Sequence, residues 1–239
     1  MGDSSNERMR DGAPGQRNMT EPGSARGGAP GPLDGLTAAL VRVAAALAEG
    51  EIDVLRERLA AARRAGVPDR WIEELLLQSL LVVGYPLTLV AFAAWREVAG
   101  ALPAGGDGEG EELAHEDWAS WAKRGAVVCA AVYGRAYHKL LLNLRSLHPA
   151  IEDLVLVDAY GKLIGRPGLD LKRRELCTVA AIAVLGTARQ LHSHLRGALN
   201  TGATRAEVEA VLELIDADLD PEHRRSAREQ WEDVKGRKL

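Results

Sequence analysis

One pattern of apolar residues and glycines occurs twice along this chain, and a duplicated pattern constrains the fold more than any single motif. In each copy an apolar run with helical spacing ends at a glycine, which tolerates the left-handed backbone of a helix C-cap, and another helix begins soon afterwards. Placing Gly66 on Gly202 without a gap aligns the copies. The sequence therefore predicts a tandem repeat of one helical unit. The matching pairs are Val43 and Val179, Ala44 and Ala180, Ala45 and Ala181, Gly50 and Gly186, Leu55 and Leu191, Leu59 and Leu195, Ala62 and Ala198, Glu73 and Glu209, and Leu76 and Leu212.

The expected architecture is all-α. Hydrophobic residues make up 46% of the 239 residues, with alanine and leucine prominent and a single phenylalanine, which favours packing between helices. Only residues 154–157 have a strand-like composition, and Leu147-His148-Pro149 before them suits a helix start as easily. We expect two antiparallel helical units that pack together as one pseudo-twofold unit.

Two segments lack any apolar periodicity. Residues 1–34 are rich in glycine, proline, serine and charge, so they cannot offset the entropy lost on ordering, and we expect a disordered N-terminal tail. Residues 103–112, PAGGDGEGEE, are predicted to form a glycine-rich acidic linker. This places the first helical repeat at 35–102 and the second at 113–239.

Charge and cysteine content exclude some classes of function. The formal net charge of -4 gives no general attraction to phosphate, so we expect no nucleic-acid partner. Cys129 and Cys177 lie far apart, each within an apolar helical run, where a thiol behaves as a small hydrophobe. A reducing, cytoplasmic location is the expectation that fits them best.

The apolar stretch 75–94 approaches the length of a membrane span, which needs ~20 residues. Polar Gln78 and Ser79, followed by the break Gly84-Tyr85-Pro86, instead favour two buried helices and no membrane partner.

The two copies differ in chemistry. The second carries Glu175 and His194, and the first has Ala39 and Arg58 at the matching positions. A glutamate and a histidine on neighbouring apolar helices are candidates for an acid–base pair. The structural alternatives are a packed histidine bonded to a carbonyl oxygen and a first-turn glutamate favoured by the helix dipole.

Three segments carry a resemblance to a known family: Arg166-Pro167-Gly168-Leu169, Arg174-Glu175-Leu176, and the run from His194 to Gly202. Together they resemble the carboxymuconolactone decarboxylase family, which includes alkylhydroperoxidase D-like proteins. The resemblance is good in the second half of the chain and weaker in the first. The peroxidase branch has a Cys-x-x-Cys motif before the histidine, where this chain has Thr187 and Gln190, so a thiol peroxidase is not expected.

The resemblance implies an alkylhydroperoxidase D-like fold and cofactor-free decarboxylation, or related proton transfer, on a small unsaturated carboxylic acid or lactone. It makes His194 the general acid and Glu175 its partner. No metal is expected, because His192 and His194 diverge on a helix. The predicted substrate-binding residues are Arg166, Tyr160, Arg196 and Asn200, with Arg166 as a carboxylate anchor.

A catalytically silent scaffold for oligomerisation or partner binding is the alternative, which fold analogy leaves open. In either case we expect a homo-oligomer, a trimer or a dimer, because related proteins assemble through apolar helical faces. Tyr133 lies in an apolar helical run, where core packing is the expected role and contact with a pocket is the alternative.

Overall fold

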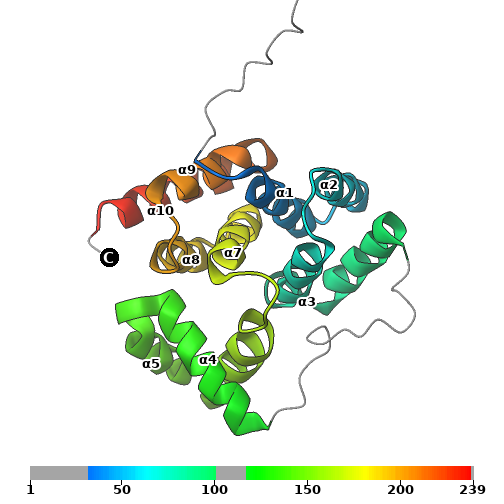
Figure 1. Ribbon diagram of the computed structural model, residues 1–239. Coiled ribbons are helices and arrows are strands. Elements are labelled where there is room, and N and C mark those ends of the chain that lie inside the picture. The colour runs from blue at the N-terminus through cyan, green and yellow to red at the C-terminus, as the bar shows by residue number, and fades with distance from the viewer. Residues whose placement is uncertain (1–31, 101–116, 238–239) are drawn as a thin grey trace, which may run out of the picture. The chain divides into compact units, whose positions relative to one another are not determined.

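The structure is a computed structural model that describes residues 32–100 and 117–237. Within these ranges every regular element is a helix and no strand occurs (Figure 1), which confirms the all-α prediction. The predicted linker 103–112 and nearly all of the predicted tail 1–34 lie outside the described residues.

The two copies of the repeat form the body of the fold. The bounds of α7 and α8 lie 136 positions after those of α1 and α2, and the α9–α10 pair covers the positions equivalent to the whole of α3. The tandem repeat predicted from the glycine register is thereby confirmed. The first copy consists of α1 (Gly35–Glu49), α2 (Ile52–Arg64) and α3 (Asp69–Ala99), and the second of α7 (Leu171–Leu185), α8 (Ala188–Asn200), α9 (Arg205–Leu214) and α10 (Pro221–Lys235).

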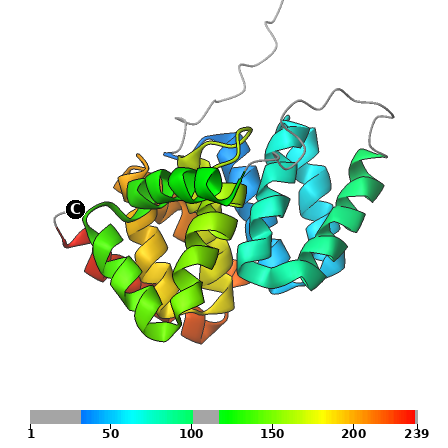
Figure 2. The same cartoon turned by 90° about the horizontal axis from the view of Figure 1, so that it is seen from below.

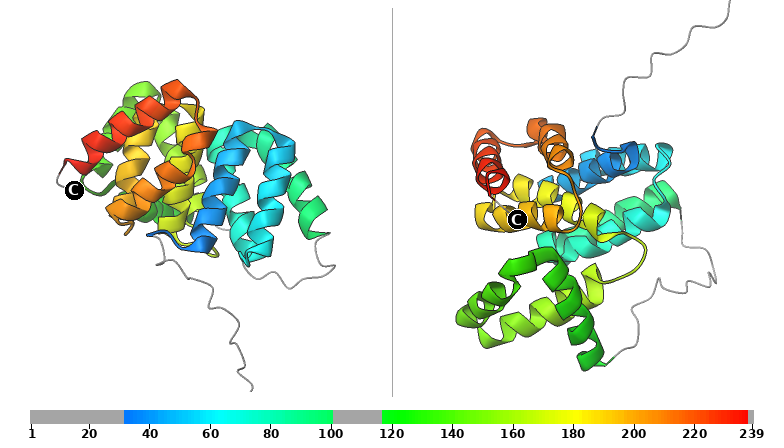
Figure 3. Two further views of the ribbon diagram at one scale, coloured as in Figure 1. Left: turned by 90° about the horizontal axis from the view of Figure 1, so that it is seen from above. Right: turned by 60° about the vertical axis from the view of Figure 1, so that its left-hand side comes forward.

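The copies meet where α1 packs beside α7 (Figures 1 and 3). Each helix begins at an aspartate cap: Asp34 accepts a hydrogen bond from the Thr37 backbone N–H, and Asp170 accepts one from the equivalent Arg173 N–H. The Arg173 side chain then crosses between copies, donating from Nε to Thr37 Oγ1 at 2.8 Å and pairing with both aspartates. Equivalent residues thus contact each other across the pseudo-twofold axis.

Helix α3 bends back on itself. Among the described residues it alone is long and apolar enough to cross a bilayer, but its backbone breaks at Gly84 (φ 74). Trp95 Nε1 donates to Glu73 Oε1 at 2.9 Å, although residues 22 positions apart in a straight helix would be separated by ~33 Å. The two arms therefore lie antiparallel (Figure 2). The second copy repeats this contact between Trp231 and Glu209 at 3.1 Å, because α9 and α10 occupy the positions of the two arms.

A buried ionic cluster joins the first copy to α7. The Arg174 side chain is fully buried, and its Nη2 lies 2.8 Å from Oε2 of Glu74 on α3. Arg174 also donates to the Gln78 amide oxygen and the Leu169 carbonyl, and Arg166 binds the same Glu74 carboxylate at 3.0 Å. Shared hydrogen bonds offset part of the cost of removing these charges from water.

A further helical segment lies between the two copies in the sequence. It has no counterpart in the described part of the first copy. The interval predicted as the second repeat, 113–239, therefore contains this segment as well as the repeat itself. The strand-like residues 154–157 open a π-helix within it. Its elements are α4 (Trp118–Tyr133), η1 (Gly134–Ala136), α5 (Tyr137–Leu147), α6 (Pro149–Asp153) and the π-helix η2 (Leu154–Ile164).

Two glycines let α4 and η2 cross in direct backbone contact. A Cβ atom on Gly125 would lie 1.8 Å from the Leu156 carbonyl oxygen, and one on Gly161 would lie 2.4 Å from the Trp121 carbonyl oxygen. No side chain fits at either position. This crossing fixes the first half of α4 against η2.

The bend of α3 leaves apolar side chains in solvent, so the expectation of two buried helices holds only in part. Tyr85 is 70% exposed and Leu89 is 64% exposed. The equivalent positions in the second copy hold Pro221 and Arg225. The same surface is therefore exposed in both copies but carries large apolar side chains only in the first. This makes the bend of α3 a candidate contact surface.

We predict that the protein self-associates through this bend, as a trimer or a dimer, and that Leu89→Glu lowers the particle mass toward the 25.7 kDa of one chain, because a carboxylate would have to be desolvated in the interface. Light scattering at several concentrations measures this. Arg225→Glu, at the equivalent position, is the matched control and leaves the mass unchanged. A wild-type monomer at high concentration would contradict the prediction.

A second prediction concerns the buried cluster. Glu74→Gln removes the carboxylate that Arg174 and Arg166 share, and leaving buried guanidinium groups without their counter-charge costs ~3–5 kcal/mol in free energy of unfolding. Urea unfolding measures the loss. Glu97→Gln is the control, because Glu97 is 58% exposed in its pair with Arg56 and contributes less than ~1 kcal/mol. Equal losses for the two variants would show that the cluster adds no specific stability.

Candidate functional site

The residues predicted to form an acid–base pair contact each other. Helices α7 and α8 form a hairpin joined at Gly186, so Glu175 on α7 comes to face His194 on α8. His194 Nδ1 lies 2.9 Å from Glu175 Oε2; the glutamate is 1% exposed and the His194 side chain 16% exposed. A carboxylate accepts here, so Nδ1 donates and Nε2 remains for a ligand. Within the described residues Nε2 has no hydrogen-bond partner.

A glycine on α8 makes room for this contact. A Cβ atom on Gly197 would lie 2.4 Å from Glu175 Oε2, nearer than any real side chain approaches. The equivalent position in the first copy is Ala61. That copy also has Ala39 where the second has the glutamate, so no carboxylate has to be accommodated. Sequence reasoning missed Gly197. The available signal was a glycine within a helical run, one turn after His194.

Two tyrosines cover the pair. Tyr133, at the end of α4, packs edge to face against His194 with ring centroids 6.4 Å apart, and against Tyr160 of η2 at 6.2 Å. Burial, assisted by the charge of Glu175, raises the pKa of Tyr133 to about 12, although a hydrogen bond from the Tyr160 hydroxyl opposes the rise. Burial also raises the pKa of Tyr160 well above its usual value, so both phenols stay protonated at neutral pH. Nearby Cys129 is an inert thiol, since burial raises its pKa to about 12.

An open groove of about 720 Å³ runs between α5 and α8 and is lined by His194 and Tyr133. Its charged lining side chains, apart from histidines, are Lys139, Arg189 and Arg196, and no aspartate or glutamate is among the lining residues. None of these three cations has an acidic partner within 32–100 and 117–237. The groove therefore presents uncompensated positive charge next to the acid–base pair.

The sequence profile of the carboxymuconolactone decarboxylase family matches residues 18–97 and 155–233, one match over each copy of the repeat. The chain belongs to the carboxymuconolactone decarboxylase family. The two matches together span more than half of the chain, as expected for the tandem member that the sequence predicts.

Three relatives of known name share parts of the chain. Peroxisomal protein 2 of Schizosaccharomyces pombe is 29% identical over 57% of this chain and 63% of its own length. The 4-carboxymuconolactone decarboxylase of Acinetobacter baylyi is 31% identical over 38% of this chain and 68% of its own length. Nitrosuccinic acid decarboxylase of Metarhizium robertsii is 42% identical over 26% of this chain and 43% of its own length. The chain thus spans less than two thirds of the first of these relatives.

Three other residues predicted to bind the substrate, Arg166, Tyr160 and Arg196, do not share one environment in the structure. Arg166 is not one of the groove-lining residues; its guanidinium binds the protein's own Glu74 carboxylate. Tyr160 is 6% exposed behind Tyr133, so it reaches the groove only through that residue. Arg196 lines the groove. The structure therefore brings His194, Glu175 and Arg196 to one place and leaves Arg166 in the ionic cluster.

Asn200, also predicted to bind the substrate, makes a hydrogen bond to the end of α4. Its Nδ2 donates to the Val132 carbonyl oxygen at 2.8 Å, and the chain then leaves α4 at Gly134 (φ 51), where a Cβ would lie 3.2 Å from the Asn200 amide. In this structure Asn200 holds the end of α4 that carries Tyr133.

Other polar groups near α8 have structural partners. His192 Nε2 lies 2.9 Å from Asp233 Oδ2 on α10, so the two histidines of the His-x-His run bind different carboxylates. In the described part of the chain no cluster of three histidine, cysteine or acidic side chains is suited to a metal ion. Thr187 caps α8 and Gln190 lines the groove, at the positions of the peroxidase cysteines.

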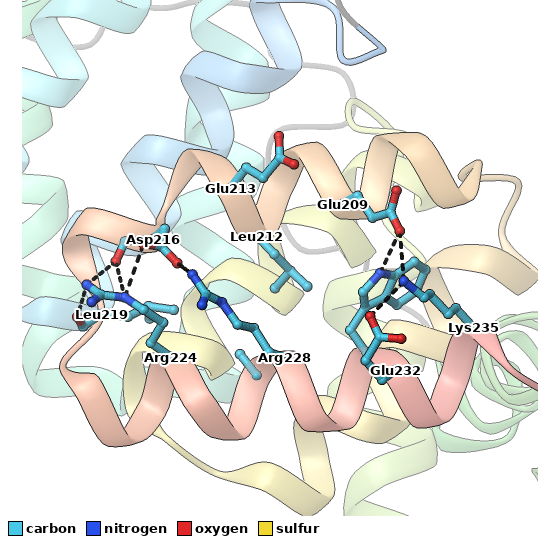
Figure 4. Close-up of a pocket in the computed structure, with 11 residues that line it drawn as sticks. Glu209, Leu212, Glu213, Asp216, Leu219, Arg224, Arg228, Glu232 and Lys235 are labelled. Atoms are coloured by element: carbon cyan, nitrogen blue, oxygen red, sulfur yellow. Dashed lines mark hydrogen bonds and ion pairs between the residues drawn. The ribbon is translucent and has the colours of Figure 1, made fainter.

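A second groove of about 450 Å³ lies between α9 and α10 (Figure 4). Its basic side chains are all paired with acids: Asp216 binds Arg224 and Arg228, and Glu209 binds Lys235. Asp216 thus forms ion pairs, and Asp220 caps α10. Among the described residues that line this groove, every lysine and arginine has an acidic partner, in contrast to the cations beside His194.

We predict that Gly197→Ala separates the acid–base pair. The added Cβ would displace the Glu175 carboxylate and cost ~1–3 kcal/mol in free energy of unfolding, as overpacking does in other cores. Thermal unfolding measures the cost, and the histidine NMR signals report loss of the Nδ1 hydrogen bond. Gly35→Ala is the control, because a Cβ there meets nothing within 4 Å. An unchanged His194 signal in Gly197→Ala would contradict the geometry.

Proposed function

We propose that the protein decarboxylates a small unsaturated carboxylic acid or lactone, or catalyses a related proton transfer on it, in the groove between α5 and α8. The observation that carries the proposal is the His194–Glu175 pair beside a groove whose charged lining is cationic and free of acids. Relatives named as decarboxylases of carboxymuconolactone and of nitrosuccinic acid support the reaction class.

Cations on α8 and α5 would hold the substrate. A carboxylate in the groove meets Arg196, two positions after His194, and has Lys139 and Arg189 available from the same lining. A guanidinium binds a carboxylate through two parallel hydrogen bonds, which sets its orientation as well as its affinity. This assigns to Arg196 the anchoring role that the sequence suggested for Arg166.

His194 would then supply a proton. The bond between the carboxylate carbon and its neighbour breaks, carbon dioxide leaves, and the electron pair is delocalised into a conjugated carbonyl group of the substrate. The Nε2–H of the His194 imidazolium donates its proton to the resulting carbanion, and water in the open groove replaces that proton. Glu175 stabilises the imidazolium through Nδ1, and the Tyr133 ring restricts its orientation. This step requires no cofactor.

The alternative function, a silent scaffold, has one supporting observation. The exposed apolar bend of α3 belongs to the copy that lacks both members of the acid–base pair. Assembly and catalysis are compatible uses of the two copies, so self-association alone does not favour the scaffold. Absence of turnover on a broad panel of unsaturated and lactone acids would favour it.

We predict that His194→Gln lowers the turnover rate ~10²–10⁴-fold, because it removes the general acid, and that Glu175→Gln lowers it less, since the amide still orients the ring. Carbon dioxide release from the panel measures the rate, and circular dichroism verifies folding. Arg58→Ala, at the first-copy position equivalent to His194, is the matched control and keeps the rate. Wild-type activity in a folded His194→Gln variant would refute the assignment.

A further inference from the structure

Three of the five α5 residues that line the groove opposite His194 are leucines, and the other two are Lys139 and Asn143. Leu140, Leu144 and Leu147 of α5 line the groove, and their spacing of four and three residues places them on one face of the helix. No residue of α5 is fully buried, and Leu147 is 75% exposed. These three side chains, the leucine stripe, therefore have apolar surface that the described fold leaves in contact with water.

The α8 wall is different in kind. Arg189, Ser193 and Arg196 line the groove with the same four-and-three spacing, so they share one face of α8. The two arginines are separated by ~10 Å along the helix axis, from a rise of 1.5 Å per residue. In Figure 1, α5 lies below α8 on the same side of the molecule. The groove thus has cations on both walls, and its leucines lie on α5 alone.

We propose that the substrate is an amphipathic carboxylic acid, with its carboxylate on the α8 arginines beside His194 and an extended hydrocarbon body along the leucine stripe. This rests on the proposed function and names its substrate class. Charge complementarity fixes one end of the ligand and apolar contact fixes the other. A compact, polar diacid would leave the leucine stripe in contact with water.

The size of the groove agrees with such a ligand. Sites for drug-sized molecules have volumes of roughly 300–1,000 Å³, and this groove encloses about 720 Å³. Leu147, which is 75% exposed, gains most from contact with a hydrocarbon chain, because each methylene group removed from water strengthens binding.

Calorimetric titration with saturated acids tests the substrate class separately from turnover, because these acids have no conjugated carbonyl and cannot lose carbon dioxide by the proposed step. Butanoate, hexanoate and octanoate are compared at constant ionic strength with octanol and octanedioate. We expect affinity to rise about two- to fourfold for each added methylene group. Octanol, without a carboxylate, and octanedioate, with a charge at its apolar end, should both bind at least tenfold more weakly than octanoate.

Substitutions test the contributions of the two walls of the groove separately. Leu144→Gln should flatten the dependence on chain length, and Leu142→Gln should not, because Leu142 is 66% exposed on the same helix but does not line the groove. Arg196→Gln should weaken all three acids by a similar factor of about ten. Arg225→Gln, an exposed arginine on α10 outside the groove, is its control.

Equal affinity of the wild type for butanoate and octanoate, or for octanoate and octanedioate, would overturn the substrate class while the His194 test of decarboxylation stands. A lower particle mass of Leu144→Gln with an unchanged chain-length dependence would also overturn it, since a second copy of the chain would then cover the leucine stripe.

Discussion

The buried contact between Arg174 and Glu74 sets the position of α7, and the rest of the structure depends on that helix. Arg174 directs its charge toward α3 of the first copy, where Glu74 and Gln78 receive it. Successive residues on a helix point about 100° apart, so Glu175 is turned toward α8 and meets His194. A rotation of α7 that improved one contact would break the other. The ionic cluster and the candidate acid–base pair are therefore fixed by the same helix.

The duplicated fold divides its roles between copies. Three positions differ together: the second copy has Glu175, His194 and Gly197, and the first has Ala39, Arg58 and Ala61. The glycine is needed only where the carboxylate is present, so the loss of the acid removes the reason for the small residue. In exchange, the first copy supplies the side chains that anchor α7. The first copy supports a site that it does not contain.

Local sequence patterns predicted those features of the fold that depend on residues close together in the chain. Glycine stops and the register of the repeat predicted the helices of the two copies and their order. The contact between Glu175 and His194 followed from placing them on adjacent helices of one hairpin. In contrast, the pairing of Arg166 with Glu74 joins residues 92 positions apart, and no local signal points to it. An arginine in a loop looks equally available for a substrate until its tertiary partner is known.

The groove and the close crossing of α4 with η2 could not be predicted from the sequence either, because both depend on contacts between residues far apart in the chain. Gly125 and Gly161 lie in ordinary helical runs, and only their contact with distant backbone atoms shows why they lack side chains. The cations Lys139 and Arg196 lie on different helices, so their convergence is a property of the fold.

The grouping of those cations is itself informative. The chain has more acidic than basic residues and a net charge of -4, so charged residues drawn without selection would more often be acids than bases. The groove between α9 and α10 shows this behaviour, because each of its basic side chains has an acidic partner. The groove beside His194 brings like charges together without one, which costs electrostatic free energy in the empty protein. A bound carboxylate would remove that repulsion, and binding energy gained in this way favours an anion over a neutral molecule of the same shape. The leucine stripe of α5 then determines which anion binds, because it discriminates by hydrocarbon contact where the cations discriminate by charge.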